Sequence, residues 1–525
     1  MAGKVTEHAI SIESTEVGQT STGRYRGIHA ALPLDGMEHV RRETSERSIS
    51  ITEDAQTTLA KRFEIVREAG KNAKNQSPTP KIQKVIFYLQ NHKDFEKHYE
   101  PRVVSVGPIH HGKPKYKLGE KYKLVLTSEF IEDSGKSMGD VYKKIKEKIK
   151  ELRDCFEEEV TKDYDDDAFA WLLFVDGCAI LQFIYCLVKD KFKDLNIKND
   201  SAAFGNQDLL LLENQLPYRL LILLMSLSEK KTELEDSIKT FIQRNISVPP
   251  AEDHSSIFRC EFLSGLSWKL CQRSKRRQAE SEKKKSDYSK EKLHEQRISI
   301  EGDPIHLLDL LRTRLLANHG GQVVQNINPK KQMCLYWQSY RNIEELQAAG
   351  IHLKRSKISQ RSLGDISFTT LLCFGFLWLP PLIVDDLTGP KFLNLIAYEL
   401  CPDFMNDYGV TTYISFLESL IDEAKDVKEL RKAGILYNLL GSDQEVAQLF
   451  NEIGTDLVPN NDIYNDVRFK IQQYYKNKVK TLISQAINDH FRSPWTFIAF
   501  LAAFLALLLS ALQTWYTVPW LNKKN

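Results

Sequence analysis

The chain has 525 residues, enough for one large domain or for two to three ordinary ones. Hydrophobic residues make up 42% and charged residues 27%, which are ordinary values for a globular protein. The 72 basic and 70 acidic residues nearly cancel, so no global electrostatic field points to nucleic acid, and function has to be sought in local segments.

Residues 1–80 are predicted to be disordered, with one possible helix. Residues 1 to about 50 are polar and rich in Ser, Thr and Glu, and they lack the apolar stretch of a secretory signal. From Glu53 to Lys74, the apolar residues Leu59, Phe63 and Val66 recur at helical spacing. This helix is expected to end before the prolines that follow, because proline cannot continue it.

A large helical body with few short strands is expected from residue 81 to residue 491. Arg102–Pro108 is a short β-like run closed by Gly-Pro, and a helical pattern resumes near Lys117. Gly441-Ser442-Asp443 predicts a helix stop followed by the N-cap of a new helix. Residues 468–491 are predicted to form an amphipathic stem.

Three long apolar blocks are predicted to be core helices of a soluble body, namely Ala168–Val188, Gln207–Leu227 and Leu371–Val384. The first two carry charged residues that hydrocarbon disfavours, and Pro380-Pro381 interrupts the third. The alternative is that the chain crosses a membrane several times. The fold class expected is therefore mainly α, with one C-terminal transmembrane helix.

Residues 272–298 differ in composition from the body. They carry the basic runs Ser-Lys-Arg-Arg and Lys-Lys-Lys interleaved with glutamates, which predicts a flexible, solvated insert. Contact with acidic lipids and a nuclear signal are the alternatives.

The cysteines are scattered singly, and several lie in apolar runs. This pattern favours buried reduced thiols over a disulfide framework or a zinc site, which fits a cytosolic body. The eight are Cys155, Cys178, Cys186, Cys260, Cys271, Cys334, Cys373 and Cys401.

Residues 495–518 contain no charged side chain and are long enough for the roughly 20 residues that a membrane-spanning helix needs. Trp495 marks one end of the run, and Trp515 and Tyr516 mark the other, where amphipathic rings favour the membrane interface. A single-pass transmembrane helix is predicted, followed by a short tail over 519–525. The alternative is a buried core helix.

The body is expected on the cytosolic side of the membrane. Lys476, Lys478, Lys480 and Arg492 precede the span, although two lysines in the tail argue the other way. Glycan on the sequons that begin at residues 199 and 245 would contradict this orientation. Whether the membrane is the plasma membrane or an endomembrane stays open.

Common catalytic motifs are missing from the sequence. It contains no Walker-type loop, dinucleotide glycine fingerprint, His-Glu-x-x-His helix, Gly-x-Ser-x-Gly elbow or Cys-x-x-Cys pair. This lowers the odds of the commonest NTPase, zinc-protease and hydrolase classes, and no catalytic residue, cofactor or metal ligand is assigned.

Two constellations remain as candidates. His110-His111 follows Gly-Pro at a turn, where adjacent histidines either bind metal or move protons, or simply hydrogen-bond the turn. The second constellation is a set of carboxylates in or beside apolar runs. In active sites such groups serve as acids, bases or ligands, and elsewhere they cap helices or join buried polar networks. They are Asp176, Glu213 and the pair Asp385 and Asp386.

Several blocks in order resemble the plant family called "domain of unknown function 247". They are VSVGPIHHG at 104–112, VDGC at 175–178, DLLLLENQLP at 208–217, HLLDLLR at 306–312, AGI at 349–351, NLIAYE at 394–399, LGSD at 440–443, PW at 494–495 and QTWYTV at 513–518. The resemblance covers about residue 81 to the end.

The resemblance implies a plant protein with a single C-terminal membrane segment and no established enzymatic activity. Some members at grass self-incompatibility loci look like pollen-side determinants of self recognition, and others are associated with growth or stress responses. The sequence departs from the family pattern at Ile109, usually aromatic, at Gln182, usually an acid, and in Val85–Gln90. The change at 182 puts in doubt any catalytic or metal role that needs the acid.

The leading hypothesis is a membrane-anchored recognition or signalling protein that acts through protein partners and does not bind nucleic acid. The first alternative is a membrane-bound enzyme with a metal-assisted or acid/base site. The second is a structural membrane adaptor.

Overall fold

The structure is a computed structural model that describes residues 59–71, 80–90, 94–246, 304–316, 342–356, 362–371, 374–477 and 494–517. The chain forms two compact units, Met1–Ser77 and Pro78–Asn525. The predicted disorder over 1–50, the charged insert 272–298 and the tail 519–525 lie outside the described residues. Most of the predicted stem, from residue 478 on, does so as well.

The described part of the first unit is a helix over residues 59–71, which confirms the helix predicted there. Its apolar residues Leu59, Phe63 and Val66 are exposed.

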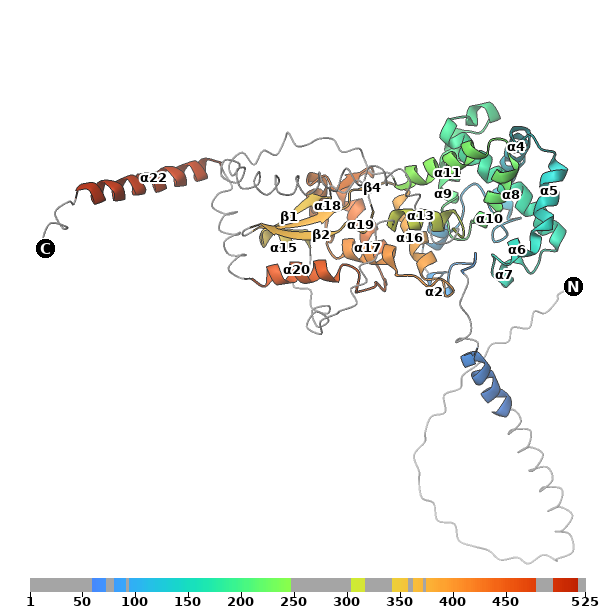
Figure 1. Ribbon diagram of the computed structural model, residues 1–525, viewed down its shortest axis with the longest axis horizontal. Coiled ribbons are helices and arrows are strands. Elements are labelled where there is room, and N and C mark those ends of the chain that lie inside the picture. The colour runs from blue at the N-terminus through green and yellow to red at the C-terminus, as the bar shows by residue number, and fades with distance from the viewer. Residues whose placement is uncertain are drawn as a thin grey trace, which may run out of the picture. The chain divides into compact units, whose positions relative to one another are not determined.

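The first part of the second unit is built from helices (Figure 1). They are α2 (Phe87–Gln90), α3 (Phe95–Tyr99), η1 (Pro114–Tyr116), α4 (Lys117–Ser134), α5 (Met138–Glu147), α6 (Ile149–Arg153), α7 (Glu158–Thr161), α8 (Asp166–Lys189), η2 (Phe192–Leu195), α9 (Asn199–Asp208), α10 (Tyr218–Leu227) and α11 (Lys231–Ile246).

Helix α8 is the centre of this part. The Asp165 side chain caps its start by accepting from the Ala168 N–H, and Asp190 ends it in the left-handed conformation with φ of 55°. Helices α4, α5, α10 and α11 all pack against it. Its apolar side chains are therefore buried on nearly every face. This is why its sequence is hydrophobic along the whole length and has no polar stripe.

The second part combines helices with short strands. Its elements are α13 (Leu307–Leu316), α15 (Ile343–Ala348), β1 (Ile351–Arg355), β2 (Ser367–Leu371), β3 (Phe374–Leu379), β4 (Leu382–Val384), α16 (Thr388–Glu399), α17 (Gly409–Glu418), α18 (Ala424–Lys432), β5 (Leu436–Asn438), α19 (Asp443–Ile453) and α20 (Asn465–Tyr475). The sheet order is β1-β3-β2, with β1 parallel and β2 antiparallel to β3, and β4 pairs in parallel with β5.

The mainly helical fold class with few short strands is confirmed, but two of the three apolar blocks were assigned wrongly. Leu371–Val384 is not a helix, because the chain forms the end of β2, β3 and β4 there. Burial along β3 alternates from residue to residue, as the period of a strand requires, and Pro380-Pro381 separates β3 from β4.

The block Gln207–Leu227 is the end of α9, a non-helical stretch and then α10. In this stretch the side-chain amides of Asn214 and Gln215 donate to the backbone carbonyls of Asp208 and Leu211, and such bonds compete with those of a continuous helix. The first block, Ala168–Val188, is confirmed as the core helix α8.

Of the other local predictions, one was wrong, one was confirmed in part and one was confirmed for the described residues. The β-like run Arg102–Pro108 is irregular and not a strand. Ser442 does cap α19, accepting from the Glu445 N–H, but the element before it is β5 and not a helix. The thiols of Cys155, Cys178, Cys186 and Cys401 are free, as expected, and the other cysteines lie outside the described residues.

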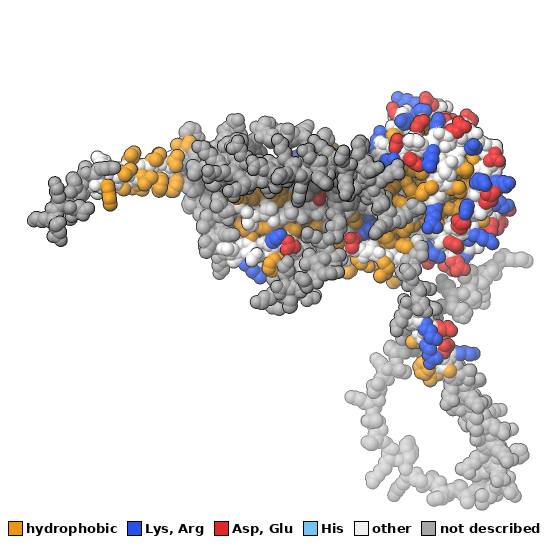
Figure 2. All heavy atoms as spheres, viewed as in Figure 1, with side chains coloured by type: hydrophobic (Ala, Val, Ile, Leu, Met, Phe, Trp, Pro, Cys, Tyr) orange, Lys and Arg blue, Asp and Glu red, His pale blue; other side chains and the backbone are white. Residues whose placement is uncertain are grey.

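Helix α22 (Pro494–Thr517) follows as a separate, uncharged and mostly apolar element. Its window Ile498–Trp515 is long and apolar enough to cross a membrane, and 0% of that window is buried. Helix α8 passes the same test of length and composition, but 83% of its window is buried inside the protein. Figure 2 shows apolar side chains along α22, whereas basic and acidic side chains intersperse on the helical part around α4 and α5.

Candidate functional site

Residues 102–113 form an irregular segment whose backbone is held by buried side chains. Asp208, the last residue of α9, accepts hydrogen bonds from the N–H groups of Arg102, Val103 and Val104 at 2.8, 2.8 and 2.9 Å. A buried backbone without strand or helix pairing needs such partners, because an unpaired N–H group is costly. Asp208 therefore supplies the pairing that a neighbouring strand would otherwise give.

Asn214 continues this role further along the segment. Its Oδ1 accepts from the Val106 N–H at 2.7 Å, and its Nδ2 donates to the carbonyls of Val104 and Asp208 at 3.0 and 2.8 Å. The amide thus joins the segment to the stretch that follows α9, and all of its partners are backbone groups.

Asp176 and Lys123 form a buried ion pair beside the same segment. Lys123 Nζ donates to Asp176 Oδ1 at 2.6 Å and to the Ser105 carbonyl at 2.9 Å, and Asp176 Oδ2 accepts from the Gly107 N–H at 2.8 Å. Burial alone would lower the pKa of Lys123, but the attraction of Asp176 and then Glu120 holds that pKa above its ordinary value. The lysine therefore stays charged inside the protein.

Glu213 and His110 form the second buried contact of the segment. Glu213 Oε1 accepts from the Val85 N–H at 2.8 Å, and Oε2 lies 3.0 Å from His110 Nε2. The Nδ1 of His110 lies 3.0 Å from Lys113 Nζ. An ammonium group only donates, so Nδ1 accepts from Lys113, whereas the contact of Nε2 with Glu213 Oε2 lacks the geometry of a hydrogen bond.

His111 and the acids at 385 and 386 do not join this network. His111 is exposed, with its ring centroid 6.3 Å from that of Tyr164, so the two adjacent histidines diverge. Asp385 accepts from the Leu387 N–H and the Thr388 hydroxyl at the start of α16, and Asp386 is exposed. Asp176, Glu213 and His110 are thus brought together around one segment, while the other three candidates are not.

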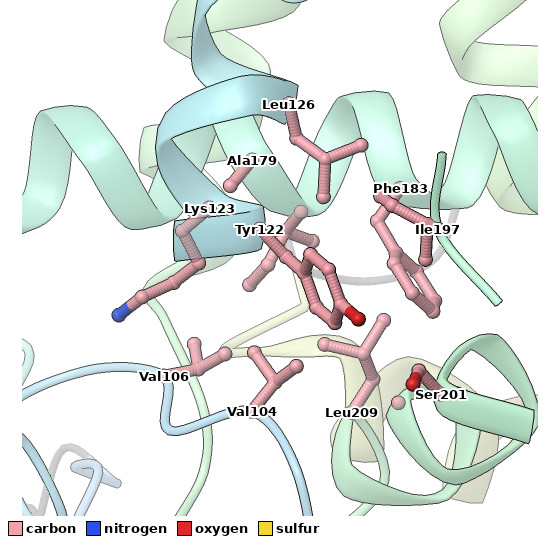
Figure 3. Close-up of a pocket in the computed structure, with 12 residues that line it drawn as sticks. Val104, Val106, Tyr122, Lys123, Leu126, Ala179, Phe183, Ile197, Ser201 and Leu209 are labelled. Carbon is pink, nitrogen blue, oxygen red and sulfur yellow. The ribbon is translucent and has the colours of Figure 1, made fainter. Parts of the chain in front are cut away.

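A small cavity lies beside Lys123, lined mostly by apolar side chains of α4, α8 and the segment with Val104 and Val106, and by Ser201 and Gly205 of α9 (Figure 3). Its volume is about 20 Å³, little more than one water molecule occupies. In Figure 3 the Lys123 ammonium points away from Tyr122 and Phe183, so the charge is not presented to this space.

Sequence reasoning missed Lys123. Nothing local marks Lys123, because its partner Asp176 is 53 residues away along the chain. It also missed three potential metal ligands, Asp94, His98 and Glu452, each with one ligand atom within 4.8 Å of the others. The Asp-x-x-x-His spacing of Asp94 and His98 is visible in the sequence, but the third residue, Glu452, comes from α19, which is distant in the chain.

The structure also explains why Gln182 can stand where the family pattern usually has an acid. Gln182 is buried in α8, and its Nε2 donates to Asp133 Oδ2 at 3.0 Å. Lys230 Nζ donates to the other oxygen of Asp133 at 2.5 Å. The amide thus serves as a neutral donor to a carboxylate that already has a cationic partner.

The fold and this network define a mainly helical protein whose core is organised around an irregular segment held by buried acids and amides. A plant family whose description is "plant protein of unknown function", DUF247, matches residues 82–509. The chain belongs to this family. The match begins at the first residues of the described body and ends inside α22, so it includes the network.

Two relatives from Arabidopsis thaliana match over most of their length. UPF0481 protein At3g47200 is 25% identical over 455 residues, which cover 82% of this chain and 85% of the relative. Putative UPF0481 protein At3g02645 is 22% identical over 464 residues, covering 79% of this chain and 86% of the relative. No solved structure matches the chain.

Proposed function

We propose that this plant protein is anchored in a membrane by α22 and that its helical body acts as a recognition or signalling module for protein partners. The observation that carries the proposal is that α22 is free of charge and wholly exposed in its apolar window. An exposed apolar surface of this length is costly in water, and it is stable once placed in hydrocarbon.

The dimensions of α22 suit a single span. Its 24 residues extend about 36 Å at 1.5 Å per residue, and the hydrocarbon layer is about 30 Å thick. Trp515 near its end is 82% exposed, so its ring is free to lie at the membrane–water interface, where Trp side chains are enriched.

Recognition is favoured over catalysis by what the buried acids do. Asp176, Asp208 and Glu213 each accept from backbone N–H groups of distant segments. A general base needs a lone pair directed at a substrate, and the cavity beside Lys123, the partner of Asp176, has room for about one water molecule. These groups therefore support the fold that a partner would recognise.

A cytosolic body is part of the proposal. Basic residues at 476, 478, 480 and 492 precede the span. Burial raises the pKa of the Cys186 and Cys401 thiols to about 12. Such thiols stay protonated and unreactive, which suits a reducing compartment.

The resemblance to pollen-side determinants makes self recognition the particular version to test first. It requires that alleles differ more on the exposed surface of the body than in its core. Equal allelic variation on the surface and in the core would favour the alternative hypothesis of a structural membrane adaptor.

The test is proximity labelling in the native tissue with the labelling enzyme at the N-terminus. We compare the full chain with a chain lacking residues 494–517 and with one whose span is replaced by an unrelated span. We expect shared partners for both anchored chains and a different set for the unanchored one. If an unrelated body on the same anchor labelled the same proteins, the recognition role would be wrong.

Orientation is tested on the same chain through its own sequons. Asn199 is the first residue of α9, in a sequon whose Asp200 is exposed, so a lumenal body would present it to the glycosylation machinery. We expect no mobility shift on glycosidase treatment. A shift that disappears in Asn199→Gln would reverse the orientation.

A further inference from the structure

A histidine and two carboxylates meet between α3 and α19, and none of the three belongs to the network around residues 102–113. Asp94 is the N-cap residue of α3, and His98 lies four positions later on the same face of the chain. Glu452 comes from the last turn of α19. Their ligand atoms all lie within 4.8 Å of one another.

The position of His98 is fixed by a buried amide. Asn394 of α16 donates from Nδ2 to the His98 carbonyl at 2.8 Å, and its Oδ1 accepts from the Leu212 N–H at 2.8 Å. Helix α16 packs against both α3 and α19. The histidine and the glutamate are therefore held by one common element, which is the preorganisation that a binding site needs.

The separation of the ligand atoms suits one ion. His98 Nε2 and Glu452 Oε1 are 3.1 Å apart. Two ligands at about 2.1 Å from a tetrahedral ion are roughly 3.4 Å apart, so a small movement of the carboxylate admits the ion. The Glu452 side chain is 34% exposed, and it can make this movement without disturbing the core.

The charges also suit a divalent cation. Asp94 and Glu452 each bring a carboxylate oxygen within 4.8 Å of a ring nitrogen of His98, and carboxylate oxygens and imidazole nitrogens are ligand types that zinc accepts. Lys97 is exposed, so water screens its repulsion of a cation.

We propose that Asp94, His98 and Glu452 bind one divalent cation of the zinc class, with water in the remaining coordination position. One imidazole nitrogen and two carboxylate oxygens form a ligand set of the kind that zinc accepts. The ion joins α3 to α19 across more than 350 positions of the chain (Glu452 is 354 residues from His98). Its role is to stabilise the body, and it stands apart from the proposed membrane anchoring.

The test measures zinc in the full chain, purified without a histidine tag in detergent micelles. After removal of metal by chelator and titration with ZnCl₂, we expect one equivalent of zinc by elemental analysis and a rise in Tm. Asp94→Asn and Glu452→Gln should each weaken binding on the order of tenfold or more and abolish the rise. Both changes keep side-chain size, so the folded apo proteins remain comparable.

His111→Gln is the matched control, because that ring is exposed and lies outside the cluster. It should bind zinc as the unchanged chain does. Cobalt bound in place of zinc should give the visible absorption of a four-coordinate site, which Glu452→Gln should lack. No stoichiometric zinc, or equal affinity in all of the variants, would overturn the proposal while leaving the anchor proposal intact.

Discussion

Helices α8 and α22 have the same length and pass the same test for a membrane span, yet they have opposite environments. Each has 24 residues, and the apolar window is 83% buried in α8 and 0% buried in α22. The informative difference is Asp176, a charge in the middle of α8 whose cationic partner Lys123 lies on α4. A buried charge with a partner elsewhere in the chain marks a core helix, whereas α22 has no charge that needs one.

The largest effect is expected from placing a charge in α22. Leu507→Arg puts a guanidinium near the middle of the helix, which costs about 2.5–3.5 kcal/mol of insertion free energy. We expect the chain to move from the carbonate-resistant membrane fraction to the soluble fraction, with Leu507→Met as the control that stays bound. A soluble unchanged chain would show instead that α22 is covered by protein, as α8 is.

The second-largest effect is expected from removing the cationic partner of Asp176, the charge that distinguishes α8 from α22. Lys123→Met keeps the length of the side chain but leaves Asp176 buried without its cation, which costs about 3–5 kcal/mol of unfolding free energy. Urea unfolding of the full chain in micelles measures it. Lys121→Met, two residues earlier on α4 and exposed, should change the unfolding free energy little.

The pair also makes a double substitution informative. Lys123→Met combined with Asp176→Leu removes both charges and leaves the buried middle of α8 without a charged side chain. We expect it to be more stable than Lys123→Met alone, because the fully buried Asp176 charge is then gone and only the partly exposed Glu120 loses its cationic partner. Equal instability of the single and double variants would mean that the packing of the lysine stem, and not its charge, holds α4 to α8.

Acid should act on the body and not on the anchor. Burial lowers the pKa of His306 to about 4, although Asp309 opposes this. The unfolded chain binds this proton below about pH 6.5 and the folded chain only near pH 4, so folding stability falls as pH falls between them, by about 3 kcal/mol.

Urea unfolding between pH 7 and pH 4 measures this loss. His306→Gln should have a shallower dependence on pH, because it lacks the titrating ring. Membrane association should be constant over the same range, since residues 494–517 contain no acidic, basic or histidine side chain. Identical pH slopes for the two chains would assign the acid sensitivity to other groups.

The smallest effect concerns Gln182. Gln182→Leu removes a donor to Asp133 but leaves the ion pair of Asp133 with Lys230, so we expect a loss of about 1 kcal/mol in unfolding free energy. Asp133→Asn is the comparison variant, and it should cost more because it also discharges the ion pair. A higher unfolding free energy for Gln182→Leu would mean that an apolar side chain at this position of α8 is more favourable than the hydrogen bond to Asp133.

Part of the candidate site was predictable from the sequence, because the signals were local. Asp176 and Glu213 stood out as acids within apolar runs, and both proved to be buried partners of backbone groups. Lys123 did not stand out, since a lysine in a charged helix is ordinary. The zinc ligands could not be predicted, because Glu452 reaches His98 only through the packing of α16 between their helices.

Strands and breaks were harder to predict than helices for the same reason. In Leu371–Val384 the apolar run fitted a buried helix and a buried strand equally, and pairing of β3 with β1 and β2 decided between them. In residues 208–217, bonds from Asn214 and Gln215 to nearby carbonyls outweighed the helical pattern.

The sequence by itself determined the helical class, the core helix α8 and the apolar helix α22, because periodicity, length and the absence of charge are local properties. Only the tertiary structure decided which acids meet which donors around residues 102–113, and which apolar helix is covered by protein. Burial and pairing depend on segments far apart in the chain, and the free energy of a buried charge is set by the partner that the fold brings to it.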